Sequence, residues 1–350
     1  MTAPFFEVEN LYVSFAGRQR LFQPTMPSTK AVNGISFTIE PRRTFGLVGE
    51  SGSGKSTVAR AILQLTPISA GRIRLDGVDV TRVQSDDELA FRKRVQAVLQ
   101  DPFSSLNQVH QVRTIVGDGI TRHFGIKPGP EREQRILGLL DEVGLTGEFL
   151  DRYPYEMSGG QRQRVSIARS LAVEPDLIIA DEATSALDVS IQSQVINVLR
   201  RVQADTGVGI LFIGHDLEVV RHMSDDVGVM YLGFLVEAGA AEGVYESPSH
   251  PYTEMLIASA PVPDPEAQEE RRRLRRTFRR DTEPPSPSDL PPGCPFESRC
   301  PVSMDICSRE MPTATVARHG GYVRCHLHTS GPILAGESVV DFIRSATTRK

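Results

Sequence analysis

One short segment combines glycine, hydroxyl and lysine residues at the spacing of a phosphate-binding loop. Residues 49–57 read Gly-Glu-Ser-Gly-Ser-Gly-Lys-Ser-Thr. Gly52 and Gly54 let the backbone wrap closely around an anion, and the helix that follows points its N-terminus at the phosphates. Lys55 can reach the terminal phosphates, and the Ser56 hydroxyl can ligate Mg²⁺. The segment therefore predicts a site for a nucleoside triphosphate with Mg²⁺, formed by Gly49, Ser51, Gly52, Gly54, Lys55, Ser56 and Thr57.

An acidic pair follows an apolar run later in the chain. Leu177-Ile178-Ile179-Ala180 is followed directly by Asp181 and Glu182. Ligand chemistry in open α/β sheets lies at the carboxyl ends of the strands. Asp181 can hold Mg²⁺ through water, and Glu182 can orient and polarise an attacking water as a general base. An isolated Asp-Glu pair after a strand is more often a helix N-cap, but the phosphate-binding loop favours the catalytic interpretation.

Two further polar residues end apolar segments. Gln100 follows the segment 95–99 and can contact Mg²⁺ or the attacking water, although a loop glutamine is normally inert. His215 ends the run 210–214 and can donate a hydrogen bond to a γ-phosphate. A lone histidine is more often structural, so both signals are weak on their own.

Ser158-Gly159-Gly160-Gln161 is typical of a helix start. Ser158 is the expected N-cap, and Val165, Ala168 and Leu171 form the expected buried stripe. Helix N-termini attract phosphate, and the chain already carries one such site at residues 49–57. This second helix start therefore implies a second nucleotide contact.

The elements around these motifs alternate between strands and helices. Apolar runs predict antiparallel strands at 6–8 and 35–39, and buried strands of a parallel sheet at 45–48, 177–180, 209–213 and 227–231. Helical spacing predicts helices over 57–65 and 128–150. The strand, glycine loop and helix around residue 50 are the context that a phosphate-binding loop needs.

Composition limits the class of protein. The chain has 350 residues and a formal net charge of −5, so we expect two domains and no global field that would attract nucleic acid. Its first residues show no basic stretch followed by an apolar run, and no apolar stretch approaches the roughly 20 residues that span a bilayer. We therefore expect a soluble, cytosolic protein whose membrane role, if any, comes through a partner.

Composition changes after about residue 262. Basic runs occupy 271–276 and 279–280, and a proline-rich linker occupies 283–293. We therefore place a boundary there, with one domain at 1–262, whose helical subdomain is at about 101–172, and a second region at 263–350. The arginine run is interpreted as a solvated helix face, because the only aromatic residue near it is Phe278 and a nucleic-acid patch needs a stacking platform.

All four cysteines follow the linker. They are separated by five, six and seventeen residues, which lacks the tight Cys-x2–4-Cys pair common in zinc sites. Disulfides are disfavoured in a reducing compartment. Four thiolates converging from loops suit an iron–sulfur cluster, while zinc and free structural thiols stay open as alternatives. The candidate ligands are Cys294, Cys300, Cys307 and Cys325.

Together the nucleotide motifs resemble the ATP-binding-cassette (ABC) ATPases over residues 1 to about 262. The resemblance makes residues 49–57 Walker A, Gln100 the Q-loop, Ser158–Gln161 the signature, Leu177–Asp181 Walker B, Ser185–Asp188 the D-loop and His215 the switch histidine. It implies an α/β fold, a P-loop NTPase cassette with a mixed sheet core, an antiparallel β subdomain and a helical subdomain. It also implies that two cassettes close head to tail, so that each ATP lies between one P-loop and the partner's signature. Phe15 matches the aromatic residue that stacks on adenine, with Tyr12 as the alternative.

A narrower resemblance covers nearly the whole chain. Residues 100–107, 185–190, 250–253 and 293–301 are similar to the ATP-binding subunits of oligopeptide and dipeptide importers, in particular the second of their two ATPase subunits. This implies an ATPase at the cytoplasmic face of the cell membrane, docked on two transmembrane permease subunits. It also implies a second ATPase subunit (a paralogue or another copy), an extracytoplasmic peptide-binding protein acting indirectly, and no nucleic acid partner. Subunits of this type can carry a four-iron–four-sulfur cluster in the small cysteine-containing C-terminal domain. The chain departs from the pattern at Asn107-Gln108-Val109, Ala183 and Phe234, and the first of these bears on permease docking.

Two rival functions stay open from the sequence. A nickel or other small-solute importer would carry the same motor residues. A soluble ABC ATPase of DNA repair, translation or chromosome structure would need an inserted coiled coil or a second cassette. The span from Lys55 to Asp181 has no sustained heptads and the chain has one cassette, so the transporter interpretation is favoured.

Overall fold

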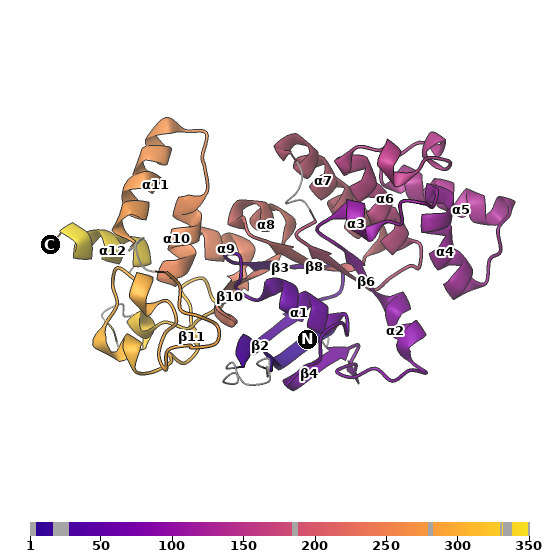
Figure 1. The fold of residues 1–350 in the computed structure, drawn as a ribbon. Coiled ribbons are helices and arrows are strands. Elements are labelled where there is room, and N and C mark those ends of the chain that lie inside the picture. Colours follow the sequence, from indigo (N-terminus) through magenta and orange to yellow (C-terminus); the bar gives the residue numbers. More distant parts are fainter. Residues whose placement is uncertain are drawn as a thin grey trace, which may run out of the picture.

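A computed structural model of the chain describes residues 5–16, 28–183, 188–278, 283–329, 331 and 338–348. Figure 1 shows a central sheet with a group of helices at one end and the C-terminal segments at the other. Within the described ranges, no helix is both long and apolar enough to cross a membrane.

The central sheet is mixed, in the order β11-β12-β10-β9-β3-β8-β7-β6. The strands from β9 to β6 in this order pair parallel with one another, whereas β10 pairs antiparallel with β9 and β12, and β12 pairs antiparallel with β11. The bounds are β3 Thr44–Val48, β6 Val95–Val98, β7 Leu177–Asp181, β8 Gly209–Gly214, β9 Asp226–Tyr231, β10 Phe234–Ala240, β11 Thr315–Val316 and β12 Tyr322–Val323. The predicted buried parallel strands are therefore confirmed.

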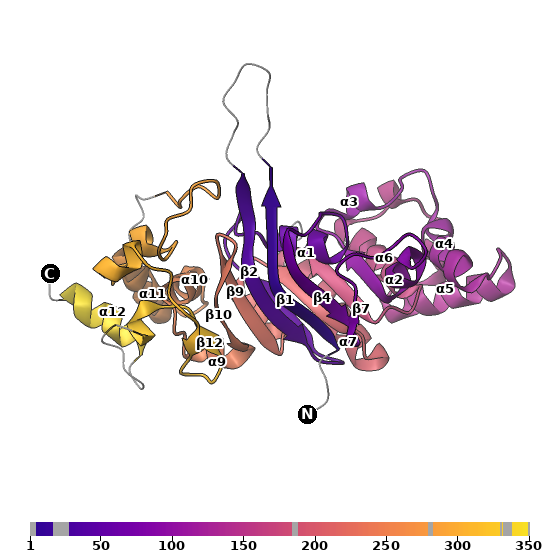
Figure 2. The same cartoon turned by 90° about the horizontal axis from the view of Figure 1, so that it is seen from below.

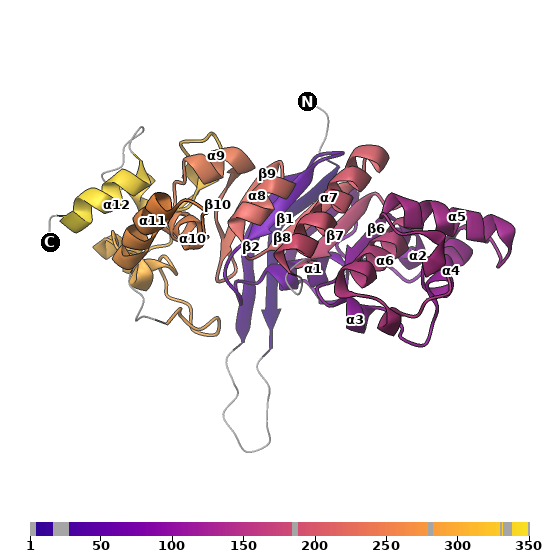
Figure 3. The same cartoon turned by 90° about the horizontal axis from the view of Figure 1, so that it is seen from above.

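Both faces of this sheet are covered, which explains why its strands are continuously apolar. Leu177 and Ile179 of β7 face one cluster of buried residues, and Ile178 and Ala180 face the other. Helices α7 (Val189–Thr206), α8 (Leu217–Met223) and α9 (Ala241–Glu246) cover one face, as Figure 3 shows.

The other face is covered by α1 (Lys55–Ile62) and a second, antiparallel sheet of order β2-β1-β4-β5. The bounds are β1 Phe6–Phe15, β2 Thr29–Ile39, β4 Ala70–Leu75 and β5 Val78–Asp79. Figure 2 shows β1 and β2 as a long antiparallel pair that confirms the predicted strands. Helix α1 was predicted over 57–65; it ends earlier, and Gln64 has a φ of 60°, outside the helical region.

A group of helices lies between β6 and β7 in the sequence and at one end of the molecule (Figure 1). It comprises α3 (Pro102–Ser105), α4 (Val112–Phe124), α5 (Pro130–Glu142), two 3₁₀ turns at Gly147–Phe149 and Pro154–Glu156, and α6 (Gly159–Leu171). A further helix, α2 (Glu88–Arg94), directly precedes β6. The predicted helix over 128–150 was too long. The chain turns at Gly144, whose φ is 70°, and the Leu145 N–H donates to the Leu140 carbonyl at 2.8 Å, so α5 is closed there.

The C-terminal segments pack onto the opposite end of the sheet. They comprise α10 (Pro251–Ser259), α11 (Pro265–Thr277), 3₁₀ turns at Glu297–Arg299, Asp305–Ser308 and His326–His328, and α12 (Val339–Thr348). Strand β12 pairs with β10 through Glu237 opposite Val323 and Ala238 opposite Tyr322. The last segments therefore extend the sheet that carries the nucleotide motifs.

Candidate active site

The loop between β3 and α1 needs glycine at two positions. A Cβ on Gly49 would lie 2.1 Å from the Met230 carbonyl oxygen, and one on Gly54 would lie 2.3 Å from the Ala31 carbonyl oxygen. Gly54 also has a φ of 104°, which favours glycine, and it is the N-cap of α1. The close approach of β2 and β9 thus fixes the path of the loop.

Lys55 is buried at the first position of α1 and bonds back to the loop. Its Nζ donates to the carbonyl oxygens of Gly49 at 2.7 Å and Glu50 at 3.0 Å. Burial lowers the pKa of Lys55, and the carboxylates of Glu182, Asp181 and Glu50 oppose that shift. The carbonyl groups of Gly49 and Glu50 therefore fix the position of the Lys55 ammonium within the loop.

Ser56 and Asp181 lie together at the N-terminus of α1 and the end of β7. The Ser56 hydroxyl donates to Asp181 Oδ1 at 3.1 Å. Burial raises the pKa of Asp181, and the hydrogen bond from Ser56 lowers it in part. A hydroxyl and a carboxylate oxygen are ligands that Mg²⁺ accepts, so these residues fit the predicted metal.

A cavity of about 340 Å³ joins the loop to the predicted catalytic residues. Gln100 and Glu182 both line it, which brings the ends of β6 and β7 to the N-terminus of α1. Glu182 has a φ of 46°, and its N–H donates to the Ile213 carbonyl at 3.0 Å, so the turn after β7 is tied to β8. The residues that line the cavity are Thr29, Lys30, Ala31, Ser51, Gly52, Gly54, Lys55, Ser56, Thr57, Gln100, Glu182, Leu232 and Pro287.

His215 is exposed at the end of β8, close to Glu182. The two residues line one small hollow together with Gln192. The predicted histidine and the predicted general base therefore meet at the carboxyl edge of the sheet, where neighbouring parallel strands end together.

The signature residues lie apart from this cavity, at the start of α6. Ser158 is exposed and forms the predicted cap: its Oγ accepts from the Gln161 N–H at 3.3 Å, and its own N–H donates to Gln161 Oε1 at 3.0 Å. Gly159 begins the helix, and a Cβ on Gly160 would lie 2.5 Å from Ile191 Cγ2 of α7. The helix start is thus fixed by its own hydrogen bonds and by close packing on α7.

The aromatic residue predicted to stack on adenine and the D-loop aspartate also lie outside the cavity lining. Phe15 ends β1 with 45% of its surface exposed, and its alternative Tyr12 is exposed to the same extent. Asp188 is the exposed N-cap of α7, whereas Ser185, Ala186 and Leu187 of the D-loop are outside the described residues. The structure therefore brings the P-loop, Q-loop and Walker B residues together, while the signature, the D-loop aspartate and the aromatic residue lie elsewhere on the chain.

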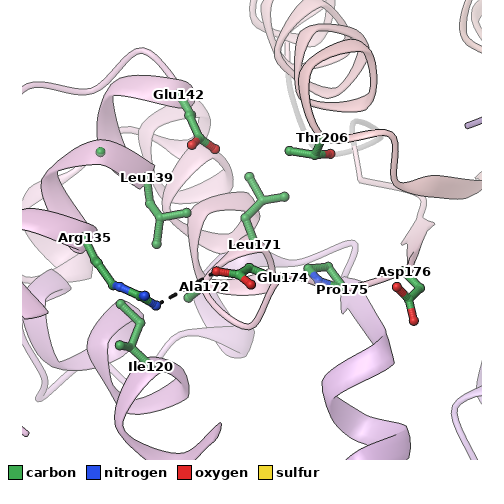
Figure 4. Close-up of a pocket in the computed structure, with 11 residues that line it drawn as sticks. Ile120, Arg135, Leu139, Glu142, Leu171, Ala172, Glu174, Pro175, Asp176 and Thr206 are labelled. Atoms are coloured by element: carbon green, nitrogen blue, oxygen red, sulfur yellow. Dashed lines mark ion pairs between the residues drawn. The ribbon is translucent and has the colours of Figure 1, made fainter. Parts of the chain in front are cut away.

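A second cavity, of about 570 Å³, lies between the helical group and the end of the sheet (Figure 4). Leu139 and Leu171 line it, and Arg135 pairs with Glu174 across it at 3.9 Å. No predicted site residue lines it. It therefore holds none of the predicted chemistry.

Three residues that contact the loop or line its cavity were missed by the sequence reasoning. Arg299, from the C-terminal region, forms a two-pronged ion pair with Glu50 of the loop, with Nη1–Oε2 at 2.6 Å and Nη2–Oε1 at 2.9 Å. The Glu50 N–H donates to the Tyr252 hydroxyl at 2.8 Å. Pro287 lines the cavity and accepts from the Lys30 N–H at 3.1 Å. Arg299 and Tyr252 lie in the segments that carried the narrower resemblance, but nothing in the sequence pairs them with Glu50.

The four cysteines are buried and free. Burial raises the pKa of Cys294 and Cys300 to about 12, and that of Cys307 and Cys325 as well. Among the described residues, no group of three or more histidine, cysteine or acidic side chains is arranged to hold a metal ion. The predicted iron–sulfur cluster is therefore not supported by this arrangement.

Two family models match the chain. One described as "ABC transporter" matches residues 32–185 and therefore includes Walker A, the signature and Asp181. The other is described as "Oligopeptide/dipeptide transporter, C-terminal region" and matches residues 236–307, which include Arg299 and three of the cysteines.

Curated relatives match along nearly all of the chain. The oligopeptide transport ATP-binding protein AppF of Bacillus subtilis is 43% identical over 92% of this chain and 97% of its own length. A probable peptide ABC transporter ATP-binding protein of Sinorhizobium fredii, y4tS, is 42% identical over 93% of this chain and 91% of its own length.

Solved structures show the same fold. The ATP-binding cassette MJ0796, a dimer bound to ADP and Pi, has a TM-score of 0.59 and 25% identity, and the match covers 67% of this chain and 98% of that one. The protein cbiO1 of Clostridium perfringens, part of the transporter complex cbiONQ, has a TM-score of 0.60 and 27% identity, over 69% of this chain and 91% of that one. The predicted P-loop NTPase cassette is confirmed. This chain belongs to the ABC transporter ATPases, in the oligopeptide/dipeptide transporter family.

Proposed function

We propose that this chain is the ATP-hydrolysing subunit of a membrane importer of dipeptides or oligopeptides. The observation that carries the proposal is the full-length similarity to relatives named for peptide and oligopeptide transport, together with the matching C-terminal region. ATP binding would close a pair of cassettes, and hydrolysis would reopen them. ATP hydrolysis would therefore return the cassettes to the open conformation, and these changes of conformation would move the permease.

We assign the work of hydrolysis to residues around the cavity of about 340 Å³. The loop N–H groups and Lys55 would bind the phosphates, and Ser56, Asp181 and Gln100 would hold Mg²⁺. Mg²⁺, when bound, neutralises charge on the β- and γ-phosphates. Glu182 would orient the attacking water, and His215 would donate a hydrogen bond to the γ-phosphate from beside it.

We propose that the signature serves the other cassette of the pair. Support comes from its position, because Ser158 is exposed at a helix N-terminus and is absent from the lining of the cavity in its own chain. Helix N-termini bind phosphate, so the Ser158–Gln161 start is suited to a γ-phosphate held by a partner's P-loop. Asp188 would meet the partner at the same interface, and Phe15 would stack on adenine.

The wider assembly follows as part of the same proposal. Two transmembrane permease subunits would hold this chain at the cytoplasmic face of the membrane, with a paralogue or a second copy as the other cassette. A peptide-binding protein outside the membrane would act through the permease. Within the chain, residues 1–262 would form the cassette, with its helical subdomain at about 101–172, and 263–350 the linker and cysteine region.

We also propose that the four cysteines hold a four-iron–four-sulfur cluster. The proposal rests on the family resemblance and on the donor set alone: four buried thiols lie in this region, although the described side chains are not gathered into a metal site. Anaerobically purified protein is expected to contain iron and acid-labile sulfide and to show iron–sulfur absorption in its ultraviolet–visible spectrum. Stoichiometric zinc, or protein free of both metals, would overturn the cluster.

Uptake measured in cells tests the transported substrate. Disruption of the gene is expected to abolish growth on an essential amino acid supplied as a dipeptide or tripeptide, and plasmid-borne wild-type chain is expected to restore it. Glu182→Gln is the matched control, because it leaves the assembly intact and removes the proposed base. Unchanged peptide uptake with lost nickel uptake would replace peptide by the metal rival.

A further inference from the structure

The C-terminal region reaches the nucleotide loop directly. Arg299 precedes Cys300, and its guanidinium pairs with both carboxylate oxygens of Glu50, the second residue of the loop. Only 14% of the Arg299 side chain is exposed, against 36% for Glu50. A planar two-pronged pair fixes orientation as well as charge, so it holds Glu50 in one place.

Glu50 is held at three points, and each bears on the loop. Its side chain binds Arg299, its N–H donates to the Tyr252 hydroxyl, and its carbonyl accepts from Lys55 Nζ. Phe296 of the cysteine region packs on Tyr252, with ring centroids 5.3 Å apart, so two of these three points depend on the C-terminal half of the chain. The residue beside the phosphate-binding lysine is therefore positioned from outside the loop.

A second contact comes from the linker of the same region. Pro287 lines the nucleotide cavity, and its carbonyl accepts from the Lys30 N–H. The linker thus forms part of the cavity wall and is hydrogen-bonded to β2. Two separate segments after residue 283 reach the cavity or its loop.

We propose that Arg299 is a positioning residue for Mg-ATP binding, through which the cysteine region sets the nucleotide affinity of the P-loop. Arg299 neutralises the Glu50 carboxylate at the start of the loop, where an uncompensated negative charge repels a triphosphate. It also fixes the loop backbone that carries the phosphate-binding N–H groups. The inference rests on the ATP-binding role proposed above.

Four variants of the full chain test this inference. Arg299→Gln is expected to weaken Mg-ATP binding about tenfold, a usual size for coupling between sites, with a higher KM and a smaller change in kcat. Arg299→Lys keeps the positive charge but cannot form the bidentate pair with Glu50. Its affinity for Mg-ATP is therefore expected to lie between those of wild type and Arg299→Gln. Arg309→Gln is the matched control, because Arg309 is an exposed arginine of the same region, and it is expected to bind as wild type does.

The double variant Glu50→Gln with Arg299→Gln distinguishes the effect of the unpaired Glu50 charge from a general disruption of the structure. Removing the Glu50 charge is expected to restore most of the lost affinity, because the repulsion disappears with it. Binding of fluorescent ATP and thermal melting are measured on all variants. Wild-type affinity in Arg299→Gln, or a double variant as weak as the single one, would overturn the inference. Failure of wild type and Arg309→Gln to bind Mg-ATP would instead overturn the proposed function.

Discussion

The chain carries two helix starts suited to phosphate, and they are built differently. At the start of α1, Lys55 is buried, Ser56 bonds to Asp181, and the loop lines a cavity with Gln100 and Glu182. At the start of α6, Ser158 is exposed, and it bonds with Gln161 of its own helix. The first start is surrounded by the predicted catalytic groups of the same chain, whereas the second has an exposed cap residue and lies outside the cavity lining.

This difference indicates that the two starts have different roles. The α1 start gathers the groups that a triphosphate and Mg²⁺ need, so it is suited to bind nucleotide by itself. The α6 start is fixed by its capping box and by the contact of Gly160 with Ile191, so it is rigid before any ligand arrives. A helix start that is fixed in this way and has an exposed Ser158 is suited to complete a site on another protein.

The largest expected effect comes from a variant that removes the predicted general base and leaves both helix starts intact. Glu182→Gln is expected to lower the rate of ATP hydrolysis by about 10²–10⁴-fold, because the general base is lost. Nucleotide binding persists, so cassette pairs accumulate with Mg-ATP, which size-exclusion chromatography detects. Hydrolysis at the wild-type rate would show that Glu182 is not the base.

The next effect is confined to the first helix start. Lys55→Met is expected to weaken Mg-ATP binding by about 10–100-fold, because a hydrogen bond to a charged group is worth more than a neutral one. Equilibrium binding of fluorescent ATP to the purified chain is the measurement. Retained affinity in this variant would remove the distinction between the two helix starts.

Ser158→Arg, at the second helix start, is expected to leave Mg-ATP binding unchanged and to impair hydrolysis. The isolated chain is expected to bind Mg-ATP as wild type does, since Ser158 is not part of the cavity lining. Hydrolysis in the assembled transporter is expected to fall about tenfold or more, because an arginine blocks the contact across the interface. A loss of affinity in the isolated chain would show that the signature serves its own nucleotide.

A packing change tests the rigidity of the second start. Gly160→Ala places a Cβ 2.5 Å from Ile191 Cγ2, so we expect a loss of about 1–3 kcal/mol in the free energy of unfolding. Gly138→Ala is the matched control, because Gly138 lies within α5 and nothing comes within 4 Å of the added atom. That control is expected to gain about 0.5–1 kcal/mol, as alanine favours a helix interior. Urea unfolding of both variants gives the comparison, and an unchanged Gly160→Ala would exclude the close contact.

The smallest effect separates capping from phosphate binding at Ser158. Ser158→Ala loses the cap and is expected to cost about 1 kcal/mol of stability, whereas Ser158→Asp keeps it. Both variants are expected to slow hydrolysis, because alanine lacks the hydroxyl and aspartate repels the phosphate. Thermal melting and ATPase rate are measured together. An active Ser158→Asp would mean that the residue only caps its helix.

Most of the nucleotide site could be predicted from the sequence because its parts are local. Residues 49–57 follow one strand and open one helix, Asp181 ends another strand and Glu182 follows it, so short patterns carry the predicted chemistry. Parallel strands then bring Gln100 and Glu182 to one edge without any further signal.

The rest depends on contacts that no short pattern records. Arg299 and Glu50 are 249 positions apart, and both are common surface residue types, so only the fold pairs them. The length of α5 was overestimated because the apolar spacing continues past Gly144, where a left-handed turn ends the helix. The arrangement of the cysteines depends on loops, whose paths spacing does not determine.

The most direct test of the account is the distance from the Ser158 hydroxyl to the nearest γ-phosphate in the assembled transporter. Cryo-electron microscopy of the Glu182→Gln complex with Mg-ATP provides it. We predict a hydrogen-bond distance to a nucleotide held by the other cassette's P-loop. A closed complex in which Mg-ATP lies wholly within one chain, with Ser158 remote from every γ-phosphate, would contradict the account.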